Sequence, residues 1–437
     1  MIDRVVVLSD DAVESGGAAG IALRSVRLLA GRDIPVTILN GSAEPDGAER
    51  WRALPRVELH SLGGLSLMQG GRGAAAARGV FSLPALRFVA EWIRANDTPG
   101  TVYHLHNWHK VLSPSVFRPL GSVAERLVMT AHDYFLVCPN GGQFDFQAGT
   151  SCDRVPLSGA CLTTQCDRRH YGHKLWRVAR HAVRQGMIDL ARSPATVLAV
   201  HDGMVPLLVR GGVAHDRVAV LRNPVVPWRT TRVEAERNGD VLFVGRLERD
   251  KGVDVVAAAA CKAGLPLTII GDGPLRDELA QIHPGARILG WRSPEEIAGL
   301  VGTVRFAVVP TRWRETFGLV TLEAIASGLP VLVSRHALIA REAEALGCVQ
   351  VCDPYDPVAL AAAMSRLARD DDAVRRMSEA GFARSAILAP RPEAWCDQLV
   401  GLYERVLARS QEAHQDRPRA APRPAARPGQ ERANLPG

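Results

Sequence analysis

Short runs of β-branched and aliphatic residues alternate with stretches of helical periodicity along most of the chain. In the first half these runs are Val5–Leu8, Val36–Leu39, Val102–His106, Leu127–Thr130, Thr196–Val200 and Val218–Leu221. In the second half they are Val241–Gly245, Leu267–Ile270, Arg287–Leu289, Val304–Val309, Val331–Val333 and Val349–Val351. Continuous apolar runs separated by helices are typical of parallel strands that are covered on both faces. The pattern therefore predicts an α/β protein with two doubly wound domains.

Prolines and polar residues interrupt this rhythm around residues 223–239, so we expect a first domain over residues 1–226 and a second over 227–391. A helix over residues 392–410 has apolar positions at helical spacing and should pack back on the globule. These positions are Trp395, Leu399, Leu402, Tyr403 and Val406. Residues 411–437 are rich in Pro, Arg and Ala, and we expect a disordered tail because they offer little apolar surface to bury.

Composition and charge limit the class of protein further. The chain has 437 residues, 47% of them hydrophobic and 23% charged, which is typical of a globular protein with more than one core. Its net charge of +7 favours anionic partners. The sequence contains no apolar run of the roughly 18 residues that a membrane span needs and no apolar core of a signal peptide near its start. We therefore expect a cytoplasmic protein.

The most informative motif is Pro310–Ala324, which follows the predicted strand Val304–Val309. A strand that runs through a Gly-containing turn into a helix presents free backbone N–H groups, and these favour a phosphate. Glu315 and Glu323 flank this turn with seven residues between them. Both carboxylates can face one ligand, one accepting sugar hydroxyls and the other ribose hydroxyls.

Two further motifs follow earlier strands of the second half, at Val244–Gly252 and Ile269–Pro274. Together the three motifs resemble the retaining family 4 (group 1) glycosyltransferases. The resemblance implies the GT-B fold, in which two Rossmann-like domains face a cleft, with the C-terminal helix returning to the N-terminal domain. It also implies that Arg246 and Lys251 neutralise the donor's diphosphate and that Glu323 holds the ribose.

The resemblance assigns further donor contacts in the second domain. Glu315 would orient the transferred sugar together with the backbone of Phe317, Gly318 and Leu319. Gly271 and Gly273 would lie near the nucleotide. Taken alone, Arg246, Lys251 or Glu323 could also be an ordinary surface charge. The joint match of three motifs is what favours a donor site.

Motifs in the first half fit the same family. Glu14–Gly20 resembles its glycine-rich loop, with Gly16 and Gly17 as donor-binding candidates, although a plain strand–helix turn is an alternative. His132 ends a strand in the family's Thr-x-His context, which implies a contact with the donor sugar beside the reacting centre. His132, Glu315, Arg246 and Lys251 are therefore the candidate catalytic residues. His104 and His106 are weaker acceptor-side candidates.

The sequence departs from the family after Val331–Val333. The expected Gly-Gly loop and Pro-Glu pair are replaced by Arg335–Glu342, which puts donor-sugar contacts from that loop in doubt. Glu342 either replaces the missing carboxylate or is an ordinary helix charge.

A segment over about 134–171 contains four clustered cysteines, namely Cys138, Cys152, Cys161 and Cys166. Their spacing lacks the close Cys-x-x-Cys pairs of common zinc ribbons. A structural metal such as zinc, disulfides or redox sensing, and unligated thiols all remain open. Similar Cys-containing segments occur in a subset of the family.

Residues 168–184 form a predicted basic amphipathic helix. Lys174, Arg177, His181 and Arg184 share one face, and Leu175 is among the apolar residues opposite. The basic face could rest on an anionic bilayer, or it could be solvated while the apolar face packs on the Cys-containing segment.

These observations predict a glycosyltransferase that moves a sugar from a nucleoside-diphosphate sugar to a glycan, lipid-linked or small-molecule acceptor. Retention and a role in surface polysaccharide or glycoconjugate biosynthesis are what the resemblance implies. We expect no cofactor for catalysis besides the nucleotide-sugar co-substrate. Another GT-B chemistry, such as an epimerase or a phosphorylase, is the enzyme alternative. A basic nucleic-acid-binding protein is the alternative from another class, but no finger or RNA-binding signature supports it.

Overall fold

The strands of the N-terminal half form a parallel sheet with the order β3-β2-β1-β4-β5-β8-β9. The computed structural model describes residues 1–13 and 17–415. The strands of this sheet are β1 Arg4–Ser9, β2 Val36–Ser42, β3 Val57–Gly64, β4 Thr101–Leu105, β5 Leu127–Ala131, β8 Thr196–Ala199 and β9 Val218–Val220. A second parallel sheet has the order β12-β11-β10-β13-β14-β15. Its strands are β10 Asp240–Val244, β11 Leu267–Ile270, β12 Arg287–Ile288, β13 Val304–Val309, β14 Val331–Ser334 and β15 Val349–Cys352.

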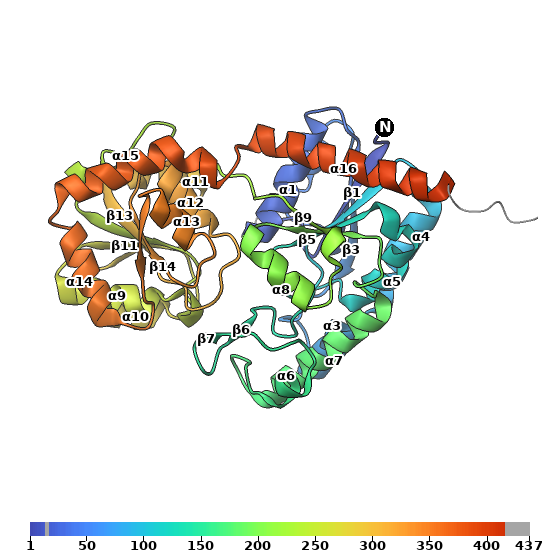
Figure 1. Cartoon of the computed structure of the whole chain (residues 1–437), viewed down its shortest axis with the longest axis horizontal. Helices are drawn as coiled ribbons and strands as arrows, with labels where there is room; N and C mark the ends of the chain where they lie inside the picture. Colours follow the sequence, from blue (N-terminus) through green and yellow to red (C-terminus); the bar gives the residue numbers. More distant parts are fainter. Residues whose placement is uncertain (14–16, 416–437) are drawn as a thin grey trace, which may run out of the picture.

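Helices cover both sheets. Each sheet with its helices forms a separate lobe, the first lobe from the N-terminal half and the second lobe from the C-terminal half (Figure 1). In the first lobe the helices are α1 Gly17–Ala30, α2 Glu49–Arg52, α3 Arg72–Val80, α4 Leu83–Asn96, α5 Phe117–Leu120, α6 Gly159–Thr163, α7 Tyr171–Met187 and α8 Val205–Arg210. In the second lobe they are α9 Val253–Ala263, α10 Arg276–Ile282, α11 Pro294–Leu300, α12 Leu319–Ala326, α13 Ala340–Ala345, α14 Pro357–Leu367 and α15 Asp371–Leu388. The prediction of two doubly wound α/β units is therefore confirmed.

Each predicted strand is present, with small shifts at its ends. Two features were not predicted: β3, which lies at the edge of the first sheet, and a short antiparallel hairpin formed by β6 Phe144–Asp145 and β7 Thr150–Ser151. In the edge strand β3 only Val57 is buried, the following positions are partly or fully exposed, and the strand ends in glycines, so it lacks the continuous apolar run of the inner strands.

The register of the first sheet brings the ends of neighbouring strands to one edge. Leu8 of β1 pairs with Leu105 of β4, and Leu105 pairs with Met129 of β5. His106 follows β4 directly and His132 follows β5, so both side chains lie at this carboxyl edge. Ligands of open parallel sheets bind beyond this edge.

The last helix, α16 Pro392–Gln415, returns to the first lobe as expected (Figure 1). Its side chains Trp395, Leu399 and Tyr403 are at most 2% exposed and share one apolar cluster with Val5 of β1 and Ile21 of α1. The helix continues through residue 415, which corrects the expectation that the tail starts at 411. The rest of the expected tail, residues 416–437, lies outside the described residues.

Two chain segments connect the lobes and lie against each other. The Val225 N–H donates to the Pro390 carbonyl at 3.0 Å, and Arg222 Nη1 donates to the Leu388 carbonyl at 3.1 Å. Arg222 also pairs with Glu342 of α13 through two contacts of 2.8 and 3.1 Å. Glu342 is thus held in an ion pair with Arg222 between the lobes. The boundary at residue 226 stays a prediction.

Candidate active site

Lys251 and Glu315 form an ion pair at the carboxyl edge of the second sheet. Lys251 Nζ lies 3.0 Å from Glu315 Oε1, and both side chains are at most 20% exposed. The Lys251 ammonium also lies 5.4 Å from the centroid of the Trp313 ring. Within the described residues the second oxygen of Glu315, Oε2, is buried and has no hydrogen-bond partner. The pair therefore presents a cation and a free acceptor in one place.

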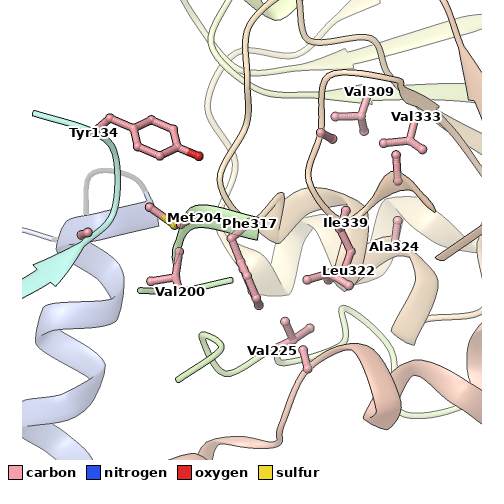
Figure 2. Packing of buried hydrophobic residues seen from close by; sticks show 14 of the residues in the cluster. Tyr134, Val200, Met204, Val225, Val309, Phe317, Leu322, Ala324, Val333 and Ile339 are labelled. Carbon is pink, nitrogen blue, oxygen red and sulfur yellow. The ribbon is translucent and has the colours of Figure 1, made fainter. Parts of the chain in front are cut away.

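The backbone after Glu315 turns sharply into α12. Gly318 adopts a left-handed conformation with φ +79° at the start of this helix, which a side chain would disfavour. The first N–H groups of a helix have no partner within the helix, so those of α12 can donate to a ligand. The Phe317 side chain is 3% exposed and packs across the lobes near Met204 and Val200 (Figure 2), so only its backbone remains available.

The N-terminus of α1 faces the N-terminus of α12. A Cβ on Gly17, the first residue of α1, would lie 3.2 Å from Cδ1 of Leu319, the first residue of α12. Two helix N-termini that meet at one point favour negative charge there. The other loop candidate, Gly16, lies outside the described residues.

His132 approaches this loop from the first lobe. Thr316 Oγ1 donates a hydrogen bond to the His132 carbonyl at 2.7 Å, which joins the two lobes directly at the site. The His132 ring lies 3.0 Å (Nε2) from Nδ1 of His106. Burial lowers the pKa of His132 to about 3, so the ring is neutral at pH 7. It can exchange hydrogen bonds with a hydroxyl but does not supply a positive charge.

His104 belongs to the structural interior. Its ring nitrogens lie 2.6 Å from the Tyr403 hydroxyl and 2.7 Å from Thr130 Oγ1, and the residue is fully buried. These contacts tie α16 to strands β4 and β5. His104 therefore has a structural role and is not available to an acceptor, whereas His106 lies beside His132.

Glu323 lies one turn into α12. Burial raises the pKa of its carboxyl from 4.5 to about 7, while the nearby Arg24 guanidinium and a hydrogen bond from Trp228 lower it. A carboxyl with such a pKa is a frequent feature of ligand sites.

Gly271 and Gly273 have a packing role that explains why they are glycines. A Cβ on Gly271 would lie 1.9 Å from the Gly245 carbonyl oxygen, and one on Gly273 would lie 2.7 Å from that of Leu247. Both glycines have positive φ angles, +134° and +156°. They allow their turn to pack directly on the backbone that carries Arg246. A nucleotide contact at this turn stays a prediction.

Arg246 lies on the surface of the same edge, with its side chain 59% exposed. Its Nη1 is 2.8 Å from Glu248 Oε1, and its Nη2 is 4.0 Å from Asp250 Oδ2. In this arrangement Arg246 does not contact the Lys251–Glu315 pair. A diphosphate at Lys251 would have to draw Arg246 away from these carboxylates.

Other polar atoms around the loop are buried without a hydrogen-bond partner among the described residues. They are Tyr134 Oη, Trp313 Nε1, Arg314 Nη1 and His336 Nε2. The positive charge of the nearby Arg314 guanidinium acts to lower the pKa of Tyr134 and that of His336, so it favours ionisation of the phenol and opposes protonation of the imidazole. Leaving such groups unsatisfied costs about 1–3 kcal/mol each, so a polar ligand here would stabilise them.

The clustered cysteines are not arranged as a metal site in the part of the chain that the structure describes. Within the described residues no group of three or more His, Cys, Asp or Glu side chains is placed to hold a metal ion, and the cysteines are free of disulfides. Cys138 Sγ lies 3.0 Å from Asn140 Oδ1, and Asn140 Nδ2 donates to Cys166 Sγ at 3.3 Å. Burial raises the pKa of Cys138 to about 11, so it stays a thiol. The structural zinc site expected at Cys138, Cys152, Cys161 and Cys166 is therefore not supported.

Helix α7 is turned the opposite way from the sequence prediction. Lys174, His181 and Arg184 are at most 2% exposed, whereas Leu175 is 47% exposed. The Lys174 ammonium donates to the carbonyls of Cys161 and Thr164, which accounts for its burial. The basic face is thus neither solvated nor presented to a bilayer. Along the described part of the chain, no helix combines the length and the apolar character needed to cross a membrane.

Two polar contacts at the site were not predicted from the sequence. The first is the Thr316 hydrogen bond to His132. The second is Arg168, whose Nη2 lies 2.9 Å from Asp250 Oδ2 across the lobes. Both contacts join residues that are far apart in the chain. The sequence could have indicated only Thr316, because it lies next to Glu315 in the motif.

Comparisons with known proteins show what this chain is similar to. Residues 238–370 match the family described as glycosyl transferases group 1. Glycogen synthase from Mycobacterium tuberculosis is 30% identical over 274 residues, which cover 59% of this chain and 64% of that enzyme, or less than two thirds of its length. Sucrose-phosphate synthase from Thermosynechococcus elongatus superposes with a TM-score of 0.68 at 18% identity, over 93% of this chain and 99% of that one. HepE from Anabaena, solved with UDP and glucose, gives 0.62 at 16% identity, over 92% and 100%. Residues 238–370 are thus similar to the group 1 glycosyltransferases, and the chain has the GT-B fold.

Proposed function

We propose that the protein transfers a sugar from a nucleoside-diphosphate sugar to a hydroxyl acceptor, with retention at the anomeric carbon. The acceptor class we propose is a glycan or a lipid-linked sugar, as in the assembly of a surface polysaccharide or another glycoconjugate. The cytoplasmic location expected from the sequence stays a prediction.

The observation that carries this proposal is the Lys251–Glu315 pair beside the N-terminus of α12. Cleavage of a glycosyl–phosphate bond increases the negative charge on the leaving diphosphate. A fixed ammonium and free helix N–H groups stabilise that charge where it develops. Glu315 Oε2, which has no partner among the described residues, is available to accept a sugar hydroxyl at the same time.

His132 and Glu323 supply the remaining roles. A neutral His132 can exchange a hydrogen bond with a hydroxyl of the transferred sugar without repelling the cationic charge that grows on its anomeric carbon. Glu323 would accept hydroxyls of the ribose. The arrangement assigns no side chain as a nucleophile, and front-side attack assisted by the leaving phosphate is the mechanism that we propose for retention.

A thermal-shift screen with UDP, GDP and ADP tests the first step. We expect one of them to raise the Tm of the wild type and to raise that of Lys251→Ala much less, because the ammonium is lost. Lys262→Ala is the matched control, since Lys262 is an exposed lysine of α9. With sugar donor and acceptor, Lys251→Ala should transfer at least about tenfold more slowly, or about 1.4 kcal/mol in the barrier.

The anomeric configuration of the product, measured by NMR, tests retention. An inverted product would refute that part of the proposal alone. A wild type that is stabilised by none of the nucleotides or their sugars would refute the donor assignment as a whole.

A further inference from the structure

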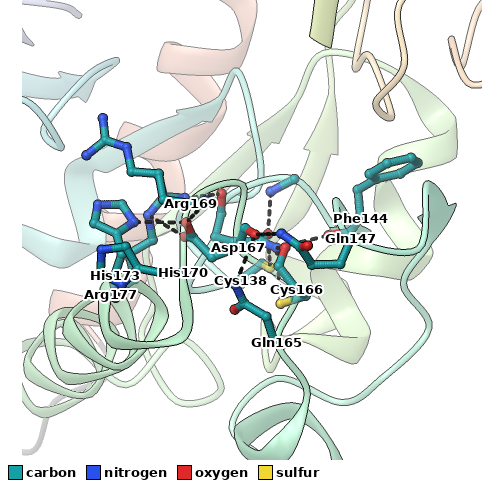
Figure 3. A network of polar contacts seen from close by, with 12 residues as sticks. Cys138, Phe144, Gln147, Gln165, Cys166, Asp167, Arg169, His170, His173 and Arg177 are labelled. Atoms are coloured by element: carbon teal, nitrogen blue, oxygen red, sulfur yellow. Dashed lines mark hydrogen bonds and ion pairs between the residues drawn. The ribbon is translucent and has the colours of Figure 1, made fainter. Parts of the chain in front are cut away.

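The Cys-containing segment, residues 134–171, is held firmly on the first lobe. Asp167 is fully buried, and its carboxylate contacts His173 Nδ1 at 3.0 Å and Arg177 Nε at 3.2 Å. It also accepts the Arg169 N–H at 2.9 Å (Figure 3). These contacts fix the backbone on both sides of Arg168, which lies between Asp167 and Arg169 in the chain.

From this base the segment reaches the second lobe at three points. The Phe144 ring lies 5.4 Å from that of His336. Gly149 lies so close to Tyr355 that an added Cβ would come within 3.1 Å of its ring. The third point is Arg168, which lies 2.9 Å (Nη2) from Asp250 Oδ2 and 3.8 Å (Nη1) from Glu248 Oε2.

The position of the Arg168 side chain is fixed further by an aromatic ring. Its guanidinium carbon lies 4.5 Å from the centroid of the Phe146 ring, which follows the β6 strand. A planar guanidinium stacked on a ring loses less freedom when it forms an ion pair.

Glu248 and Asp250 are also the carboxylates that contact Arg246, so two arginines from different lobes share one acidic pair. The Asp250 side chain is only 8% exposed. A carboxylate buried to this degree must be paired, because leaving it without a counter-charge is strongly unfavourable. If Arg168 were absent, Arg246, which contacts both carboxylates, would have to compensate their charge.

We propose that Arg168 is a positioning residue of the donor's diphosphate site: it helps to neutralise Glu248 and Asp250 from the other lobe, so that Arg246 can leave these carboxylates and bind the diphosphate. The inference rests on the proposed function, since it concerns the nucleoside diphosphate that Arg246 and Lys251 would bind. When the diphosphate enters, Arg246 leaves Glu248, and Arg168 keeps the two carboxylates compensated. Without Arg168 they retain Arg246 and repel the ligand.

The test is a titration of purified full-length protein with the nucleoside diphosphate that stabilises the wild type most in the screen of UDP, GDP and ADP. Arg168→Gln should weaken binding about tenfold at low ionic strength, and Arg168→Lys should recover part of the loss. Arg169→Gln removes the same charge from the neighbouring exposed residue and should bind as the wild type does.

A second variant separates positioning from direct contact or from a structural role. If Arg168 acts by neutralising Asp250, then adding Asp250→Asn to Arg168→Gln should bring the affinity back to within about threefold of the wild type. Damage to the fold would not be repaired by removing a second charge.

Three outcomes would overturn the inference. Arg168→Gln could bind as tightly as the wild type, which leaves the proposed function intact. The double variant could stay as weak as Arg168→Gln, which would indicate a direct contact or a structural role. A wild type that binds none of the nucleotides would refute the proposed function and the inference with it.

Discussion

Replacing Glu323 by Gln removes a carboxyl whose ionisation opposes folding at neutral pH. The side chain lies in α12 near Arg24 and Trp228, and burial raises its pKa from 4.5 to about 7. The folded protein keeps this proton up to about pH 7, whereas the unfolded chain loses it near pH 4.5. Between these two values the unfolded state binds fewer protons, so the contribution of Glu323 to stability falls as the pH rises.

The size of the effect follows from the two pKa values. Each pKa unit corresponds to about 1.4 kcal/mol, so the full penalty above pH 7 is about 3 kcal/mol. At pH 5.5 only about 1 kcal/mol of it has developed. Glutamine cannot ionise and avoids the penalty at every pH. The stability of Glu323→Gln relative to the wild type should therefore rise by about 2 kcal/mol between pH 5.5 and pH 8.

Urea unfolding of both proteins at pH 5.5 and pH 8 measures this difference. All other titrating groups are shared by the two proteins, so their contributions cancel in the comparison. Glu404→Gln, at an exposed position of α16, is the control and should change by less than about 0.5 kcal/mol over the same interval. If Glu323→Gln and the wild type lose stability in parallel as the pH rises, the raised pKa and the reasoning built on it are wrong.

Two further predictions concern the ligand and the last helix. If ribose binds the ionised Glu323, the affinity of the wild type for its nucleoside diphosphate should increase about tenfold from pH 6 to pH 8, because the carboxyl must first lose its proton; calorimetric titration should show no such increase for Glu323→Gln. Trp395→Ala should lower stability by about 3–5 kcal/mol in chemical unfolding, since this side chain of α16 is 2% exposed against the first lobe. Trp291→Ala, at a 67% exposed position, should change it little, and equal losses for both would contradict the assigned packing.

Much of the fold could be predicted because inner strands of a parallel sheet are apolar on both faces. Val304–Val309 is an example, since all six of its residues are buried. The motif that follows it could be placed at the sheet edge for the same reason. The edge strand β3 has one covered face and a weaker pattern, and it was missed.

The arrangement of charged side chains could not be predicted. Lys174 and Arg184 were predicted on a basic face that either rests on a bilayer or is solvated. They are instead buried, and carbonyl oxygens of neighbouring segments accept their hydrogen bonds. A sequence does not reveal which carbonyls fold back onto a helix. The meeting of Arg168 with Asp250 depends in the same way on how one lobe docks against the other.

The two connections between the lobes have a mechanical consequence. The chain crosses from the first lobe to the second after β9 and crosses back before α16, and the crossings are joined by the hydrogen bond from Val225 to Pro390. Two lobes that are linked by two adjacent chain segments cannot rotate freely about a single bond. Their easiest relative motion is bending about the line through both crossings, as in a hinge. Opening the lobes along this line would separate Thr316 from His132 and Arg168 from Asp250 in one movement, which couples entry of the donor to both contacts.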